Sequence, residues 1–281
     1  MRNYNKHIIV VGTGRSGTSW LSEIIATKPR YRMLFEPEHE LQTQEGHLIC
    51  DKFITEESVT YEQKAYYHKI FSNKIDSDWI GQISNRKFKM HLWPIIPKKY
   101  VIKFVRCNLS AKYMNDSFGI PVIHIIRHPY AVIFSQQRVK FPWLTDLRNF
   151  TNQDQLVRLV MEVSGIDLRN LDMFNNIELL ALRWAIENSI PLEVLGGYSS
   201  KSVVLKHEEL IEDINLFYSI CRKFNIEPRK DIENIYGRPS SKTHPKSYIK
   251  SGSKNMQELT FEQKGKVKKI LQLFNSKLYD L

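Results

Sequence analysis

HIIVVGTGRSGTSWL, residues 7–21, is the stretch from which we expect the fold to be organised. Ile8 to Val11 are β-branched and apolar, which is typical of a buried parallel strand. Glycine-rich residues 12–19 follow, and then an apolar pattern that suits a helix. Glycines let backbone N–H groups close around an anion, and a helix N-terminus adds unpaired donors. The stretch therefore predicts a phosphate-binding loop; a tight turn without a ligand is the alternative.

The loop is close to a Walker A motif but departs from it at the lysine. Thr18 stands where that lysine is expected, and the cation is Arg15 instead. Walker-type enzymes also need Mg²⁺, usually held by an aspartate after a second apolar strand, and the strand predicted over 121–126 ends in Arg127. We therefore expect an anionic nucleotide site without a metal. Its phosphate ligands would be Arg15, Ser16, Gly17, Thr18 and Ser19.

Composition places the chain among ordinary globular proteins that favour anionic ligands. A chain of 281 residues can bury one large core, and 42% hydrophobic with 25% charged residues is usual for a soluble domain. The net charge of +11 favours an anionic partner, although a lysine-rich coding bias would produce the same excess. No block of five or six like charges occurs, so we expect no nucleic-acid partner.

The cysteines and the apolar runs indicate a cytoplasmic protein. Cys50, Cys107 and Cys221 are widely spaced and form no CxxC pair, which argues against a disulfide framework or a zinc site. The N-terminus lacks a signal-peptide core, and no apolar run is long enough to span a membrane.

Apolar periodicity predicts strands that alternate with helices. The predicted strands are 8–11, 31–35, 100–105, 121–126 and 202–205, and the predicted helices are 18–27, 61–72, 108–116, 129–137, 176–195, 208–224 and 260–278. Residues 38–99 and 138–175 are poorly periodic as a whole, and we interpret them as insertions in a single domain spanning 1–281. We expect an α/β fold: a P-loop-type three-layer sandwich with a mostly parallel central sheet of about five strands.

Polar residues follow several of these strands. The loop, Glu36, Arg106, Arg127 and His207 each come after a strand, so we expect them to meet at the carboxyl edge of the sheet. Arg127 and Ser135, which lies eight residues on in the following helix, are predicted to form a second anion site. An ion-paired arginine and a surface serine are the alternative.

Three motifs together resemble the sulfotransferase superfamily, which uses 3′-phosphoadenosine 5′-phosphosulfate (PAPS). They are residues 14–21 (GRSGTSWL), 35–37 (FEP) and 126–135 (IRHPYAVIFS). Residues 206–210 (KHEEL) resemble the family's Tyr-Glu-Asp-Leu segment, and residues 238–241 and 248–252 resemble the loop that closes over the nucleotide. The motifs run in the family order from residue 8 to about residue 278, and they are closest to carbohydrate and tyrosylprotein sulfotransferases.

The resemblance implies roles for the nucleotide-binding residues. PAPS would be the donor and 3′-phosphoadenosine 5′-phosphate (PAP) the product, with no metal. The phosphosulfate loop would comprise Gly14 to Ser19, and the 3′-phosphate would bind Arg127 and Ser135. His207 replaces the family's tyrosine near adenine. In the closing loop, Lys250 and Gly252 match ligand positions, with Lys246 as second choice; solvated loop lysines are the alternative.

The resemblance also implies a catalytic set of Glu36, Arg15 and Lys103. The histidine base of cytosolic sulfotransferases is absent after Lys103, whereas Glu36 matches the glutamate of the carbohydrate enzymes. Glu36 is thus the predicted base; a glutamate that only caps the Pro37 turn is the alternative, and Glu38, His39 and Glu40 are substitutes. Lys103 matches a lysine that assists the leaving group, or else it forms a buried ion pair.

The predicted function is sulfuryl transfer from PAPS to a hydroxyl or amine. The acceptor would be a saccharide or a small natural product such as an alkaloid, in a bacterial cytoplasmic enzyme. Phe141 and Trp143 would line its pocket, unless they belong to the core. A P-loop nucleotide or metabolite kinase and a non-catalytic nucleotide-binding module are the alternative functions.

Overall fold

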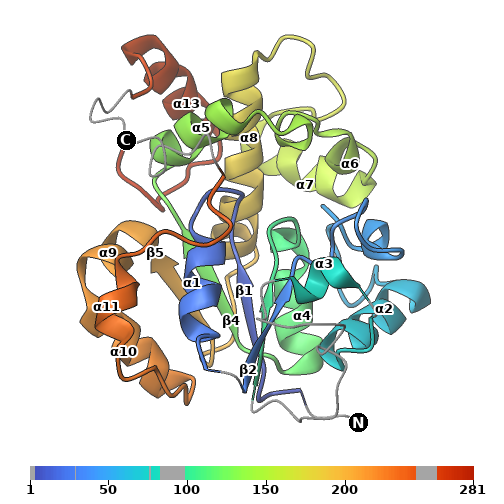
Figure 1. Ribbon diagram of the computed structural model, residues 1–281. Helices are drawn as coiled ribbons and strands as arrows, with labels where there is room; N and C mark the ends of the chain where they lie inside the picture. The colour runs from blue at the N-terminus through green and yellow to red at the C-terminus, as the bar shows by residue number, and fades with distance from the viewer. Residues whose placement is uncertain (1–3, 29, 76, 83–98, 245–257) are drawn as a thin grey trace.

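The computed structural model describes residues 4–28, 30–75, 77–82, 99–244 and 258–281, and it contains a five-stranded parallel sheet (Figure 1). The strands are β1 (Ile8–Val11), β2 (Tyr31–Phe35), β3 (Lys99–Lys103), β4 (Val122–Ile126) and β5 (Val203–Lys206). Their spatial order is β2-β3-β1-β4-β5, and every neighbouring pair is parallel. The central strand is β1, in which Ile9 pairs with Ile102 on one side and Val122 on the other. The predicted mostly parallel sheet is confirmed.

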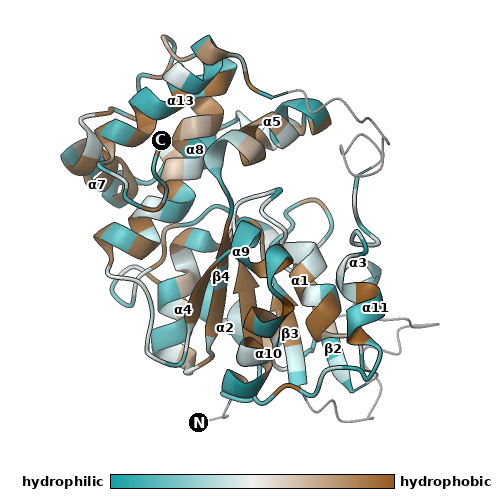
Figure 2. Ribbon diagram, turned by 90° about the vertical axis from the view of Figure 1, so that its left-hand side faces the viewer, coloured by the Kyte–Doolittle hydropathy of each residue, from teal (hydrophilic) through white to brown (hydrophobic). Residues whose placement is uncertain are grey.

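Helices cover both faces of the sheet, which gives the expected layered arrangement (Figures 1 and 2). Ile8 and Val10 pack with residues of α1 (Thr18–Ile25), α9 (His207–Glu212), α10 (Ile214–Lys223) and α11 (Ile232–Tyr236). Ile9 and Val11 pack with α2 (Tyr61–Phe71) and α4 (Ala111–Phe118) on the opposite face. A strand buried on both faces needs apolar residues at every position, which explains the run from Ile8 to Val11.

A third group of helices packs beyond the carboxyl ends of the strands (Figure 1). It comprises α5 (Pro129–Val139), α6 (Arg148–Thr151), α7 (Asp154–Ser164), α8 (Asn176–Ser189) and α13 (Phe261–Leu273), which share one hydrophobic core. Trp184 of α8 is fully buried in this core. Gln136 of α5 and Asn188 of α8 form hydrogen bonds with residues of the loop after β1.

Residues 138–175 are more regular than the sequence analysis predicted. The helix α7 lies inside this segment, and Leu156, Val157 and Val160 form its buried face. Their three- and four-residue spacing is helical, but the short pattern is flanked by irregular turns such as η4 (Pro142–Leu144). In the segment 38–99, the helix expected over 61–72 is present as α2, and η1 (Gly46–Leu48) and α3 (Asp78–Gly81) accompany it.

Several predicted helix boundaries are wrong for identifiable reasons. The helix expected over 208–224 is interrupted at Asp213, whose backbone is extended and whose side chain caps α10. The helix expected over 176–195 changes at Ile190 into the π-helical turn η5 (Ile190–Val194), which contains Pro191. The helix expected over 108–116 begins as the 3₁₀ turn η3 (Asn108–Ser110). The strand expected over 100–105 ends at Lys103, and α13 ends at Leu273.

No helix within the described ranges has the length and apolar character required to cross a bilayer.

Candidate active site

The loop between β1 and α1 is held by side chains from the segment that follows β4. Gln136 Nε2 donates to the Gly14 carbonyl at 2.9 Å, and Arg127 Nη1 donates to the Arg15 carbonyl at 3.1 Å. Gly17, with a φ of 97°, is the N-cap of α1 and offers no side-chain cap. The carbonyls of the loop are thus engaged with the protein, whereas N–H groups at the start of α1 are left for a ligand.

Two glycines of the loop are required by close neighbours. A Cβ on Gly14 would lie 2.8 Å from the indole of Trp143, and a Cβ on Gly17 would lie 2.4 Å from the ring of His207. Gly17 also has a positive φ, which a side chain would disfavour. Gly14 and Gly17 therefore allow Trp143 and His207 to pack closely on the loop, and Gly12 allows the close approach of the Ile125 carbonyl.

The two arginines predicted for separate phosphates lie in one continuous site. Arg15 Nε donates to Ser135 Oγ at 3.0 Å. The loop arginine thus contacts a serine that is predicted to bind the second phosphate together with Arg127. Burial and then the charge of Arg127 lower the pKa of Arg15, and burial lowers the pKa of Arg127. Two partly buried guanidinium groups that repel each other favour an anion between them.

His207 and two aromatic rings flank this cationic site near β5. The His207 ring meets Trp20 edge-on at 5.9 Å, and Trp20 meets Tyr236 at 5.2 Å. Burial and then the charge of Arg127 lower the pKa of His207 to about 4. His207 is therefore a neutral ring at pH 7, suited to packing against a planar group.

Glu208, which follows His207, links this part of the site to the C-terminal residues. Its carboxylate accepts from His128 N at 2.9 Å and from Tyr279 Oη at 2.8 Å. The segment resembling Tyr-Glu-Asp-Leu thus positions the start of α5, and the sequence analysis gave no signal for Tyr279.

Glu36 and Lys103 form a direct ion pair at the ends of β2 and β3. The Lys103 side chain is 2% exposed and the Glu36 side chain 19%. Lys103 Nζ lies 4.4 Å from the centre of the Phe35 ring, and Trp79 Nε1 donates to the Glu36 carbonyl at 3.2 Å. The ammonium group of Lys103 therefore lies in apolar surroundings with Glu36 as its countercharge.

The substitutes for Glu36 have other partners. Glu38 is 1% exposed, and its Oε1 accepts from Val105 N at 2.7 Å and Arg106 N at 3.1 Å. Burial and then the charge of Glu36 raise the pKa of Glu38 to about 7. Glu40 is bound to Arg106 at 2.8 Å, and His39 packs edge-on against Trp79 at 4.7 Å.

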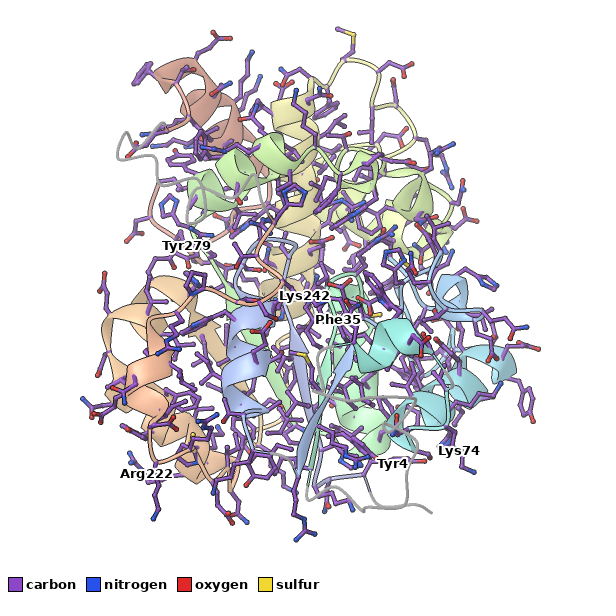
Figure 3. The ribbon with its side chains drawn as sticks, in the orientation of Figure 1. Tyr4, Phe35, Lys74, Arg222, Lys242 and Tyr279 are labelled. Atoms are coloured by element: carbon purple, nitrogen blue, oxygen red, sulfur yellow. The ribbon has the colours of Figure 1, made fainter. Side chains whose placement is uncertain are left out.

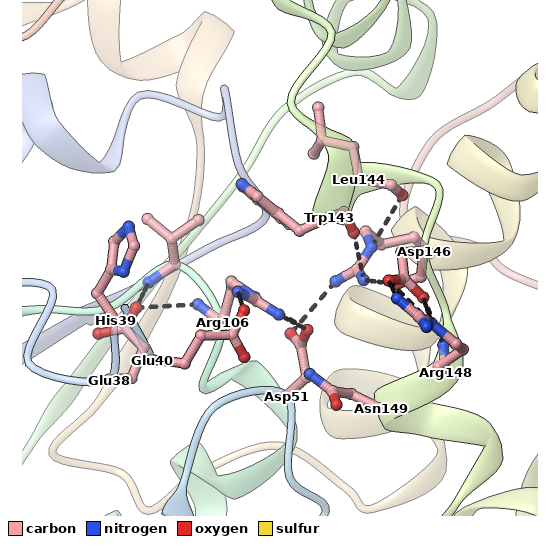
Figure 4. A network of polar contacts seen from close by, with 12 residues as sticks. Glu38, His39, Glu40, Asp51, Arg106, Trp143, Leu144, Asp146, Arg148 and Asn149 are labelled. Atoms are coloured by element: carbon pink, nitrogen blue, oxygen red, sulfur yellow. Dashed lines mark hydrogen bonds and ion pairs between the residues drawn. The ribbon is translucent and has the colours of Figure 1, made fainter. Parts of the chain in front are cut away.

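A buried ion network joins the segments 38–99 and 138–175 to the sheet edge (Figure 4). Arg106 Nη2 donates to Asp51 at 2.6 Å, and Arg183 Nη1 reaches the other oxygen of Asp51 at 3.2 Å. Arg183 also donates to the carbonyls of Trp143 and Leu144 at 2.8 and 3.0 Å. The network therefore fixes the turn that carries Trp143.

Trp143 lies between this network and the phosphate loop. The guanidinium carbons of Arg106 and Arg183 lie 5.0 and 5.3 Å from its ring centre, and Phe141 stacks near it at 6.3 Å. Trp143 is only half-buried, and its indole contacts Gly14. It is thus a wall of the site as well as part of the packing.

The described part of the predicted closing loop is fastened to α1. Glu23 accepts from Ser240 Oγ at 2.6 Å and from Ser241 N and Oγ at 2.9 Å each. Lys242 contacts Gln82 and lies 6.0 Å from the centre of the Phe35 ring (Figure 3). Lys246, Lys250 and Gly252 fall outside the described residues.

No protein-family profile and no curated protein sequence matches the chain. A sulfotransferase from Alicyclobacillus acidocaldarius is similar with a TM-score of 0.46 and 13% identity, covering 99% of this chain and 98% of that one. The sulfotransferase domain of the Synechococcus PCC 7002 olefin synthase is similar with a TM-score of 0.45 and 16% identity, covering 100% and 97%. A mouse sulfotransferase complexed with PAP has a TM-score of 0.35 and 12% identity, covering 90% and 69%. Each of these three similar structures is a sulfotransferase.

Proposed function

We propose that this chain is a sulfotransferase that transfers the sulfuryl group of PAPS to a hydroxyl or amine acceptor. The observation that carries the proposal is the continuous cationic site of Arg15 and Arg127 at an uncapped helix N-terminus. The Glu36–Lys103 pair lies at the same edge of the sheet, where a transferred group would leave the loop.

The residues of this site fit the donor. The N-terminus of α1, with Gly14 to Ser19 and the Arg15 guanidinium, would hold the 5′-phosphosulfate. Arg127 and Ser135 would hold the 3′-phosphate, together with Lys250 and Gly252 of the closing loop. The neutral ring of His207 would pack near adenine. When bound, PAPS supplies the activated sulfuryl group.

Glu36 and Lys103 have complementary tasks in the proposed reaction. The acceptor oxygen or nitrogen forms a bond to sulfur as the bond from sulfur to the 5′-phosphate oxygen breaks, and the acceptor proton passes to Glu36. Protonation of Glu36 removes the countercharge of the buried Lys103 ammonium. Lys103, with Arg15, is then free to stabilise the negative charge on the leaving oxygen.

The aromatic side chains near Glu36 favour an acceptor that contains a ring. Phe35 and Trp79 pack beside Glu36, and Trp143 walls the loop from the side of Arg106. Aromatic faces suit the apolar face of a saccharide or the flat ring of an alkaloid. We propose either class of acceptor, in a single-domain enzyme whose segments 38–99 and 138–175 shape the acceptor pocket. The bacterial origin and the cytoplasmic location stay predictions.

The decisive experiment compares thermal shifts with PAP and with ATP plus Mg²⁺. PAP at 100 times its dissociation constant should add about 2.7 kcal/mol to the unfolding free energy. A shift with ATP and Mg²⁺ alone would instead support a kinase and contradict the proposal.

A substitution at Glu36 separates an enzyme from a binding module. The Glu36→Ala variant should bind PAP as the unmodified protein does and lose PAPS turnover. Turnover that survives in this variant would show that Glu36 is not the base.

A further inference from the structure

A buried histidine in the central sheet has no task in the proposed chemistry. His124 is the one polar residue of β4, which reads VIHII, and it is 0% exposed. Burial lowers its pKa to about 4, so the ring is neutral at pH 7. Its Nδ1 lies 2.6 Å from Tyr198 Oη, and its Nε2 lies 3.2 Å from Asn188 Oδ1. A polar ring at this depth requires partners of the correct polarity.

The partners of Asn188 fix the directions of the hydrogen bonds that the His124 ring makes. Asn188 Nδ2 donates to the carbonyl of Trp184 at 2.7 Å and to Thr13 Oγ1 at 2.8 Å. A carbonyl can only accept, so the amide nitrogen must face Trp184 and Thr13, and Oδ1 must face His124. His124 therefore donates from Nε2, and its Nδ1 accepts from the Tyr198 hydroxyl.

The chain of hydrogen bonds ends on the first turn of the phosphate loop. Thr13 and Asn188 are each 1% exposed, so water does not compete for these groups. The Thr13 carbonyl accepts from Ser16 N at 3.0 Å and also contacts the Ser16 hydroxyl. Thr13 is thus fixed through both its side chain and its carbonyl, immediately before Gly14 and Arg15.

We infer that Asn188 is a positioning residue for donor binding: oriented by His124, it holds Thr13 and thereby the phosphate loop in the shape that accepts the nucleotide. The inference rests on the proposed function and adds a determinant from α8 to it. A loop held in its binding shape before the ligand arrives loses less conformational entropy on binding. An unpaired buried donor is costly, so each of these hydrogen bonds favours the side-chain orientation that the next one requires.

The test measures PAP affinity by isothermal titration in Thr13 and Asn188 variants of the full chain. Thr13→Val keeps the shape and removes the hydroxyl, and it should weaken PAP binding about fivefold or more, the worth of one hydrogen bond. Thr13→Ser keeps the hydroxyl and should restore affinity to within about twofold. Asn188→Leu should weaken binding as Thr13→Val does, and the double variant should be no weaker than either single one.

A matched control lies at the opposite edge of the sheet. Ser202 Oγ accepts from Asn115 Nδ2 at 3.2 Å and from Val122 N at 3.0 Å, also in a buried position. Ser202→Ala should lower the melting temperature and leave PAP affinity unchanged.

Two outcomes would overturn the inference, and they are distinguishable. Variants at Thr13 and Asn188 that melt at lower temperature yet bind PAP as the unmodified protein does would show a merely structural role. If the unmodified protein does not bind PAP, the proposed function fails and the inference fails with it. Thr13→Ala serves as the second variant if the valine variant does not fold.

Discussion

Among single residues, Lys103 and Glu36 show how position decides chemistry. Lys99 begins the same strand as Lys103 and is also buried, but its ammonium donates to the Phe224 carbonyl at 2.7 Å, at the amino end of the sheet. Lys103 lies at the carboxyl end and pairs with Glu36 beside the phosphate loop. Two lysines four residues apart on one strand therefore lie at its opposite ends and have different partners.

The first prediction concerns Lys103→Met. We expect kcat with PAPS to fall by about 10²-fold or more, because the leaving oxygen loses a preorganised cation, while PAP affinity changes little. Steady-state kinetics and a PAP titration measure the two effects. Lys99→Met is the matched control and should lower stability without the loss in kcat. An unchanged kcat in Lys103→Met would assign this lysine to structure alone.

The second prediction concerns the pH dependence of stability at Glu38. Burial raises its pKa to about 7 in the folded protein, against an ordinary value near 4.5. The folded state therefore holds the proton more tightly, and the stabilisation is complete below pH 4.5 and is lost as the pH rises through 7. Glu38→Gln keeps the acceptor for Val105 N, so the variant should gain about 1–3 kcal/mol relative to the unmodified protein between pH 5 and pH 8.

Urea unfolding at pH 5 and pH 8 measures this difference. Glu162→Gln, on the exposed side of α7, is the control, and its unfolding free energy should differ from that of the unmodified protein by the same amount at both pH values. Parallel curves for Glu38→Gln would mean that Glu38 titrates normally in the folded protein.

At the scale of elements, short apolar runs were predictable and interruptions were not. The β1 run and the glycine-rich loop can be recognised in the sequence, because a strand buried on both faces and a ligand-binding turn each require particular residue types. Pro191 and Asp213 break predicted helices, since one lacks a backbone donor and the other caps the next helix.

The site was predictable only where it is local in sequence. The loop and the strand-end Glu36 follow from topology, because parallel strands place their carboxyl ends together. The contact of Arg15 with Ser135 spans 120 positions, and that of Arg183 with Asp51 spans 132. Such pairings depend on packing of the whole chain, so Gln136, Asn188 and Tyr279 carried no sequence signal. The hydrogen bond that links Arg15 of the loop to the predicted Arg127–Ser135 site had no sequence signal for the same reason.

The third prediction concerns the fastening of the closing loop to α1. Glu23→Ala removes three hydrogen bonds to Ser240 and Ser241, so, if this segment covers the nucleotide as proposed, PAP should dissociate about tenfold faster. Stopped-flow displacement of PAP measures the rate. Glu227→Ala, which removes an exposed pair with Lys28, should leave it unchanged. An unaltered rate in Glu23→Ala would show that this contact does not retain the nucleotide.

At the scale of the whole molecule, Arg183 joins parts that are distant in sequence. Its guanidinium binds Asp51 and Glu187 and the carbonyls of the turn around Trp143, and it is fully buried. Such a group is stable only while all its partners remain. Arg183 therefore helps to hold the helical group beyond the sheet to the segment around Asp51, and Gln153, which bonds to Phe53 N and the Asp51 carbonyl, does the same.

The fourth prediction follows from this arrangement. Arg183→Met should lower the unfolding free energy by about 3–5 kcal/mol, because Asp51 and Glu187 lose a buried countercharge. Arg148→Met, at an exposed pair with Asp146, should cost less than about 1 kcal/mol. Chemical denaturation measures both, and equal small losses would show that the Arg183 network contributes little to stability.

The central place of β1 also has a consequence for synthesis on the ribosome. The two strand partners of Ile9, which are Ile102 and Val122, are made roughly 90 and 110 residues after it. At about 5–20 residues per second, the apolar strand β1 waits roughly 5–20 s for its first strand neighbour. Asn188, which orders the loop after this strand, is made later still. Among the five strands that the structure describes, β1 thus waits longest during synthesis for its first partner.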